Sequence, residues 1–362
     1  MLTIIALVIP LSGCKFKDLD LRLFVVAMGV DKVEGSPTRV SVTVKAAVPL
    51  GDPKQAEEKI LILTEESDTI GEAIRIMKSR TDKELDFGHC KVMLYGESYA
   101  RQGILQTSDW MLRRRDIQLL IYNAVARPTA KEVLKVQPVT ERLPGNSLLL
   151  ALSMDGTESP YIVPPMFSYR LERTLMERGS DPIMSIVEAR GKDQLEIDKS
   201  YLFNKERAVE ELNPSETRIY NLLNNKNLKT SLEAKVNGTN FSYMIERSQA
   251  SYNLKRSKDE ASSLNYHLKI RGVMEENEEG AVVTEQELHK VSQAAGEQLD
   301  EQVEKVLNKI HKSKTDPLCW GLRYTAHHWN NETEWQQWQE IEKTLTFKVH
   351  SDVRIKYTGM IR

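Results

Sequence analysis

The sequence predicts an α+β protein: a mixed α/β, multi-domain chain with about three domains. Its 362 residues are enough for two or three domains of about 100–200 residues each. The 40% hydrophobic and 28% charged residues are ordinary for a protein with an apolar core. Strand and helix patterns alternate as far as residue 134. The last third instead combines long alternating strands with amphipathic helices.

The first fourteen residues carry the pattern of a processing signal. Residues 2–10 are uncharged, and this run is too short to span a bilayer, which needs about 20 apolar residues. The following Leu11-Ser12-Gly13-Cys14 resembles the bacterial lipobox. We therefore predict that residues 1–13 are a lipoprotein signal peptide and that Cys14 carries the lipid. The alternative is a buried strand with an incidental cysteine. Because no Lys or Arg precedes Cys14, we expect the true start to lie upstream.

The next region begins with strands. Residues 21–30 are almost continuously apolar, which is typical of a strand buried on both faces. After a turn at 31–38, residues 39–48 alternate with period two, so we predict a hairpin. One face of the second strand carries Val40, Val42 and Val44, and the other carries Ser41, Thr43 and Lys45. Residues 59–64 are expected to form a further short strand.

Helices and strands then alternate. Ser67 or Asp68 can cap a helix with an apolar stripe formed by Ile70, Ala73, Ile74 and Met77. The patterns that follow predict a strand at 87–95, helices at 97–102 and 107–114, a buried strand at 117–126, and a helix from 129. Residues 14–180 are therefore predicted to form an N-terminal mixed α/β domain.

A proline-marked stretch at 144–165 is predicted to be an irregular connection, followed by a helix at 166–178. Strands are expected at 183–189 and 195–203, and Asn213-Pro214-Ser215-Glu216 should open a helix that runs to about residue 223. We assign residues 181–228 to a middle domain.

The second half changes character. Residues 232–236, 241–254 and 264–274 alternate polar and apolar side chains, as strands of an antiparallel sheet with one wet face do. Residues 284–312 predict a long amphipathic helix, and Thr284 with Glu287 matches a capping box. Further helices are expected at 316–330 and 332–344, before a closing strand. Residues 229–362 should thus form a C-terminal α+β domain with helices packed on an antiparallel sheet.

No chemistry-bearing motif stands out after Cys14. Cys90 and Cys319 are predicted to be small core residues, and a bridge between them is the alternative. The adjacent His327 and His328 would point apart on a helix and so make a poor metal site. We find no catalytic motif, and we predict no enzyme activity, cofactor or metal. His89 and Arg75 are hypothesised to be polar residues near the core.

The charge pattern does not favour a nucleic-acid partner. The net charge is −2, and the densest basic cluster, Arg113-Arg114-Arg115, is bracketed by Asp109 and Asp116. We interpret it as a solvated face. Tryptophans gather in the C-terminal helices, where we expect packing rather than a binding platform. They are Trp320, Trp329, Trp335 and Trp338.

Several blocks, taken in order, resemble the Ger(x)C family, the C subunits of spore germinant receptors. After the lipobox, residues 27–31 (AMGVD) are similar to the family's A-x-G-[IV]-D. The most specific block runs from Glu72-Ala73-Ile74-Arg75 through residues 87–92 (FGHCKV) to Gly96-Glu97 and residues 100–104 (ARQGI). Near the other end, Asp316-Pro317-Leu318 with Gly321, Trp335 and Gly359 is similar to the family's C-terminal domain.

This resemblance implies a lipoprotein on the outer face of the spore inner membrane. It also implies a non-catalytic subunit that works with two membrane subunits, A and B, in a receptor for small nutrients. The alternative function is a lipid-anchored solute-binding protein of a transporter. Such a protein should show two repeated βα lobes, whereas the second half here predicts helices on an antiparallel sheet.

Overall fold

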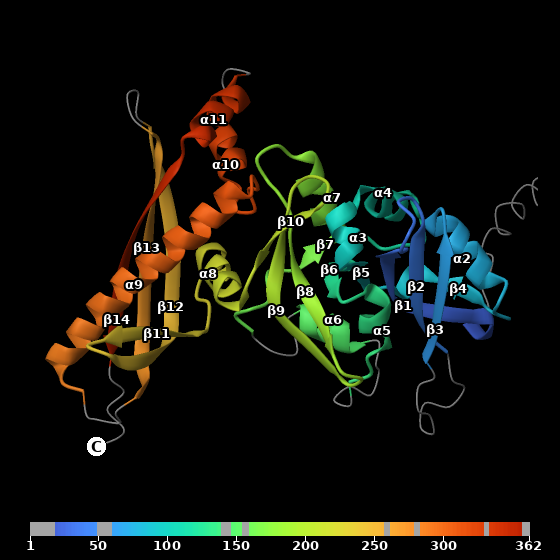
Figure 1. Cartoon of the computed structure of the whole chain (residues 1–362), viewed down its shortest axis with the longest axis horizontal. Coiled ribbons are helices and arrows are strands. Elements are labelled where there is room, and N and C mark those ends of the chain that lie inside the picture. Colours follow the sequence, from blue (N-terminus) through green and yellow to red (C-terminus); the bar gives the residue numbers. More distant parts are fainter. Residues whose placement is uncertain are drawn as a thin grey trace, which may run out of the picture.

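The computed structural model describes residues 19–48, 60–138, 146–153, 159–256, 261–278, 283–328 and 333–356. Within them the chain forms a ten-stranded sheet and a four-stranded sheet, each covered by helices, so the α+β class is confirmed. Figure 1 shows the two sheets side by side along the long axis, with the early part of the chain on the right. None of the helices in these ranges is both long and apolar enough to cross a bilayer.

The larger sheet has the order β10-β9-β8-β6-β5-β1-β2-β3, with β4 paired to β1 and β7 to β6. Its centre is parallel, because β1, β5, β6 and β8 run in the same direction. The strands are β1 (Arg22–Lys32), β2 (Val40–Ala47), β3 (Ile60–Ser67), β4 (Glu84–Asp86), β5 (Val92–Gly96), β6 (Tyr122–Arg127), β7 (Met166–Phe167), β8 (Ile183–Arg190), β9 (Gln194–Phe203) and β10 (Ala208–Leu212).

Helices and short helical turns lie between these strands. They are η2 (Leu19–Leu21), α2 (Ile70–Lys78), η3 (Phe87–His89), α3 (Glu97–Gln102), α4 (Leu105–Arg113), α5 (Ala130–Lys135), α6 (Asn146–Ser153), α7 (Ser168–Met176) and α8 (Pro214–Asn224). The predicted apolar stripe of α2 is buried, but its cap is Thr69, whose side chain accepts a hydrogen bond from Glu72 N at 3.2 Å.

The hairpin of β1 and β2 is confirmed, and both of its faces are buried. The valines of β2 face one core cluster. On the other side, Lys45 is 1% exposed, and its ammonium donates to Val136 O at the end of α5, at 3.1 Å. Burial lowers the pKa of Lys45 to about 8. The polar half of the alternating pattern is therefore part of the interior.

Two predicted strands begin later than expected. Residues 87–89 form the short helix η3, because Asp86 accepts a hydrogen bond from Gly88 N and turns the chain, so β5 starts at Val92. Residues 117–121 precede β6, and Leu119 and Leu120 lie exposed in a turn. Two further differences follow the chain: α6 lies in the predicted irregular connection, and Met166–Phe167 is strand β7, not helix.

Strands β8, β9 and β10 add to the same sheet as the strands before them. The assignment of residues 181–228 to a middle domain, with boundaries at 180 and 228, stays a prediction.

The C-terminal layer has the sheet order β11-β12-β13-β14, and its core is continuous with that of α8. Its strands are β11 (Ser231–Val236), β12 (Thr239–Lys255), β13 (Ser263–Asn277) and β14 (Thr346–Lys356), and its helices are α9 (Glu285–Lys312), α10 (Trp320–His327) and α11 (Glu334–Lys343). The capping box of Thr284 and Glu287 is confirmed.

The sheet is not purely antiparallel, because β14 pairs parallel with β13. The reason is topological: parallel neighbours need a long crossover, and α9, α10 and α11 supply it. Figure 1 shows α9 lying along this sheet, with α10 and α11 at one end.

Candidate functional site

The predicted lipid-attachment residue, Cys14, lies outside the described residues, as do the signal peptide and the closing Gly359. Cys90 is buried as predicted, and burial raises the pKa of its thiol to about 12, so it is a poor nucleophile. Cys319 is half-buried, and both cysteines are free rather than bridged. Arg75 and His89, hypothesised near the core, are both exposed, although the His89 ring packs edge-on against Phe24.

The adjacent histidines lie at the surface. His327 and His328 are exposed, and His328 stacks on Tyr324 with a ring separation of 4.2 Å. No group of three or more His, Cys, Asp or Glu residues in the described part of the chain is placed to hold a metal ion. Trp320 and Trp338 are 2% exposed and belong to the core, as predicted; Trp329 is not described.

The motif residues of the first half meet where β1 and β5 end. Asp31, the last residue of the A-x-G-V-D block, accepts hydrogen bonds from the backbone N–H groups of Ala130 and Lys131 at 2.7 and 2.9 Å. It therefore satisfies the first turn of α5. A side chain at Gly96 would lie 1.9 Å from Asp31 Oδ1, so only glycine fits there. These motif residues hold α5 against the sheet.

A second cluster surrounds Arg127 at the end of β6. Its guanidinium binds both oxygens of Glu97, at 2.8 and 2.9 Å, and also reaches Glu188 at 2.8 Å and Glu211 at 2.6 Å. The Tyr201 hydroxyl donates to Glu97 and accepts from Arg127. We call these five side chains the Arg127 cluster. It joins residues from α3, β6, β8, β9 and β10.

Charge pairing decides the protonation states in the Arg127 cluster. The hydrogen bond from Arg127 lowers the pKa of Glu97 to about 2. Burial and the hydrogen bond to Glu97 raise the pKa of Tyr201 to about 12. One guanidinium thus faces three carboxyl groups, of which Glu97 is held ionised at neutral pH by its lowered pKa. The cluster is saturated by its own partners and fits a structural role.

The two sheets meet at a junction between the loop before β8 and the loop before α10. Asp316 of the D-P-L block is 4% exposed, and its carboxylate accepts from the backbone N–H groups of Trp320 and Gly321 at 2.8 and 2.7 Å. Asp181 N donates to Asp316 O at 3.0 Å, and Asp316 N donates to the Asp181 carboxylate at 2.8 Å. Burial raises the pKa of Asp316 to about 7.

Two glycines let the backbones approach at this junction. A Cβ on Gly179, whose φ is +69°, would lie 2.4 Å from Leu322 N. A Cβ on Gly321 would lie 2.6 Å from the Trp338 ring. Lys205 completes the junction, since its ammonium donates to the carbonyls of Thr174, Glu177 and Ser180.

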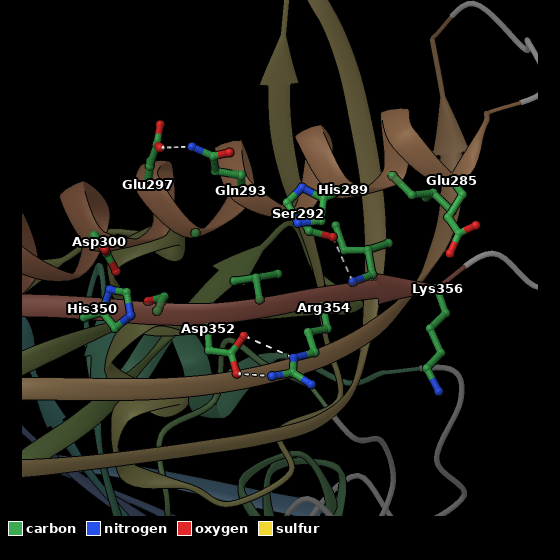
Figure 2. Close-up of a pocket in the computed structure, with 15 residues that line it drawn as sticks. Glu285, His289, Ser292, Gln293, Glu297, Asp300, His350, Asp352, Arg354 and Lys356 are labelled. Atoms are coloured by element: carbon green, nitrogen blue, oxygen red, sulfur yellow. Dashed lines mark hydrogen bonds and ion pairs between the residues drawn. The ribbon is translucent and has the colours of Figure 1, made fainter.

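A groove of about 1110 Å³ lies between α9 and β14. Figure 2 shows Glu285, His289 and Glu297 on the helix above the strand that carries Asp352 and Arg354. Arg354 pairs with Asp352 at 3.2 Å. Two buried side-chain oxygens in this groove, Asp300 Oδ1 and Ser351 Oγ, lack a hydrogen-bond partner within the described part of the chain. Most buried side-chain polar atoms in proteins have such a partner.

α9 also covers both edges of the C-terminal sheet. Ser292 Oγ and Glu304 Oε1 accept from Ile355 N and Val349 N on β14, at 3.1 and 3.3 Å. On the opposite edge strand, β11, Gln298 both accepts from Lys235 N and donates to Lys235 O, at 3.0 and 2.8 Å. One helix thus forms hydrogen bonds with backbone groups of both edge strands, which could otherwise pair with a strand of another chain.

Sequence reasoning did not find the Arg127 cluster or the junction as sites. Their members come from elements far apart in the chain, and single charged residues carry no signal of their partners. Part of the signal is present in the sequence, because Glu97 and Asp316 lie in blocks that resemble the Ger(x)C family, Gly96-Glu97 and Asp316-Pro317-Leu318.

Comparison with known proteins covers both halves of the chain. Residues 15–189 match the family described as the spore germination protein N-terminal domain, and residues 198–359 match the one described as spore germination B3/GerAC-like, C-terminal.

Two curated relatives and one solved structure extend the match. Spore germination protein GerQC of Bacillus cereus is 21% identical over 294 residues, covering 80% of each chain. The putative spore germination protein YfkR of Bacillus subtilis (strain 168) is 24% identical over 306 residues, covering 81% of this chain and 77% of the relative. The crystal structure of the GerBC protein has a TM-score of 0.59 at 17% identity, covering 94% of this chain and 99% of that one, and so shares the fold. The chain therefore belongs to the Ger(x)C family of spore germination proteins.

Proposed function

We propose that this protein is a non-catalytic subunit of a spore nutrient-germinant receptor, anchored by a lipid on Cys14 to the outer face of the spore inner membrane. Its partners in this proposal are the A and B membrane subunits and the bilayer, with no nucleic acid. The observation that carries the proposal is the family match over both halves of the chain, which begins at residue 15, directly after Cys14.

The described side chains support a binding rather than a chemical role. The Arg127 cluster is occupied by its own ion pairs, and the buried Asp316 caps a helix rather than facing a cavity. The groove between α9 and β14 is lined mainly by polar and charged side chains and suits contact with another molecule.

The alternative, a solute-binding protein of a transporter, has less support. That class should show two repeated βα lobes joined by a hinge. Here a ten-stranded mixed sheet is followed by a four-stranded sheet of different topology.

Gene deletion tests the receptor role. We expect spores without the protein to lose the response to at least one nutrient, and to regain it when the gene is restored. Normal germination of the deletion strain on every nutrient tested would overturn the proposal.

Substitution at the lipobox tests the anchor. Cys14→Ala should abolish lipid attachment, detected by mass spectrometry, and release the protein from the membrane fraction. Ser12→Ala is the matched control, because it keeps a small residue in the lipobox and should leave attachment intact. A Cys14→Ala protein that stays membrane-bound and functional would refute the anchoring claim.

A further inference from the structure

The turn before β6 exposes two leucines side by side. Leu119 is 44% exposed and Leu120 is 58% exposed, whereas Ile117 and Ile121 on either side are buried. The buried neighbours anchor the turn in the core and leave its tip apolar. Turns normally carry polar residues or glycine at such positions, so a paired apolar tip calls for a partner.

A row of aromatic rings lies beside this turn. Tyr169 N donates to Leu119 O at 3.1 Å, which fixes the start of α7 against the turn. The rings of Tyr122 and Phe167 are 4.7 Å apart, and those of Phe167 and Tyr169 are stacked at 5.7 Å. Tyr169 is 47% exposed. Tyrosine rings with an apolar body and a polar tip suit the boundary between lipid and water.

Two cations flank the turn without carboxylate partners among the described residues. Arg115 is exposed, and the Lys91 ammonium donates to the amide oxygen of Gln118, at 2.9 Å. The neighbouring Arg113 and Arg114 differ, because they pair with Asp109 and Asp116. The excess of positive charge next to the leucines is complementary to anionic headgroups.

The chain enters the large sheet at the end of the strands where this turn lies. Val26 O accepts from Lys91 N, and Lys91 O accepts from Tyr122 N, so the starts of β5 and β6 are aligned on β1. β1 runs parallel to β5, and its first residues lead to the edge that carries the turn. Leu19 lies five positions after Cys14, a reach of at most about 18 Å.

We infer that the Leu119–Leu120 turn, with the rings of Tyr122, Phe167 and Tyr169, rests in the headgroup region of an anionic bilayer. This inference rests on the membrane location in the proposed function. It adds the orientation of the protein: the end of the large sheet at which β5 and β6 start faces the lipid.

Photo-crosslinking from the Leu119–Leu120 turn tests the inference. p-Benzoylphenylalanine replaces Leu120 in the full, lipidated chain, which is reconstituted in vesicles of phosphatidylglycerol and phosphatidylethanolamine. The control places the same group at Met244, which is 45% exposed on β12. We expect a phospholipid adduct at position 120, in several-fold excess over position 244. Adding Arg115→Gln should lower the yield about fivefold at low ionic strength, the effect of one basic residue near anionic lipid.

Three results would overturn the inference: equal yields at the two positions, a crosslink between two copies of the chain, or, in spore membranes, a crosslink to a protein instead of lipid. Mass spectrometry of the same samples reports the lipid on Cys14 separately. A lipidated chain without a lipid adduct at 120 refutes the orientation and leaves the anchor standing. A lipid adduct at position 120 in a chain without lipid on Cys14 refutes the anchor and leaves the orientation standing.

Discussion

The Arg127 cluster and the Asp316 carboxylate stabilise their two regions in different ways. In the first, one guanidinium meets three carboxylates at a partly exposed edge of the large sheet. In the second, a buried carboxylate meets only backbone amides at the junction of the two sheets. The ion pair with Arg127 lowers the pKa of Glu97, whereas burial raises the pKa of Asp316 even though its amide hydrogen bonds act in the opposite direction. Glu97 therefore stays ionised in mild acid, whereas the charge of the buried Asp316 changes with pH near neutrality.

The largest expected effect comes from breaking the junction sterically. Gly179→Ala places a Cβ 2.4 Å from Leu322 N at a positive φ, so we expect a loss of about 4 kcal/mol in the free energy of unfolding. Gly238→Ala is the matched control, since its φ is +97° but nothing lies within 4 Å of the new Cβ. It should cost about 1 kcal/mol. Denaturant unfolding measures both, and equal losses would show that the close approach is not what matters.

Arg127→Met removes the guanidinium from the Arg127 cluster. It removes the one cation that Glu97, Glu188 and Glu211 share. Glu188 keeps Lys199 at 3.0 Å and Glu97 keeps Arg101 at 3.5 Å, so we expect a loss of about 2 kcal/mol at pH 7, reduced from the fully buried case by these cations and by partial exposure. The deficit should shrink as pH falls toward 4 and the carboxylates take up protons. Unfolding curves across this range check it. A deficit that stays constant with pH would mean that lost packing, not charge, dominates.

Asp316→Asn removes the titrating group at the junction and so tests its contrast with the Arg127 cluster. A carboxyl whose folded pKa lies above its unfolded value stabilises the fold most at low pH, and this contribution falls as pH rises from about 4 to about 7. The variant loses one amide acceptor, so we expect a cost of about 1–2 kcal/mol near pH 5 that becomes smaller near pH 8. Stability should be measured at both values. A deficit that grows with pH would contradict the raised pKa.

The smallest effect is expected at the rim of the Arg127 cluster. Arg101 donates to the Tyr201 hydroxyl and lies 3.5 Å from Glu97, but half of its side chain is exposed. Arg101→Met should therefore cost less than about 1 kcal/mol and should leave the acid response of Glu97 almost unchanged. A loss as large as that of Arg127→Met would show that the two arginines act as one unit.

The sequence predicted elements whose information is local. The stripe of α2 and the capping box of α9 follow from spacing alone, because both depend on neighbours within one or two turns. The burial of Lys45 does not, since α5 covers that face from more than eighty residues away.

The Leu119–Leu120 turn shows the same limit in a different form. An apolar run from 117 to 126 predicts a buried strand, but the strand begins only at Tyr122. Which residues of this run are buried depends on where β6 joins β5, and this register is a property of the sheet. The parallel pairing of β14 was likewise hidden, because strand direction depends on the crossover that precedes it.

The covering of both sheet edges by α9 has a consequence for folding during synthesis. β14 is the last strand among the described residues, and it can form only after residue 356 has been added to the chain. The large sheet is complete by Leu212, so it can close while the rest of the chain is still being made. Until β14 arrives, the long strand β13 has no partner on one side. The time between the two events is when this protein most needs protection from pairing with other chains.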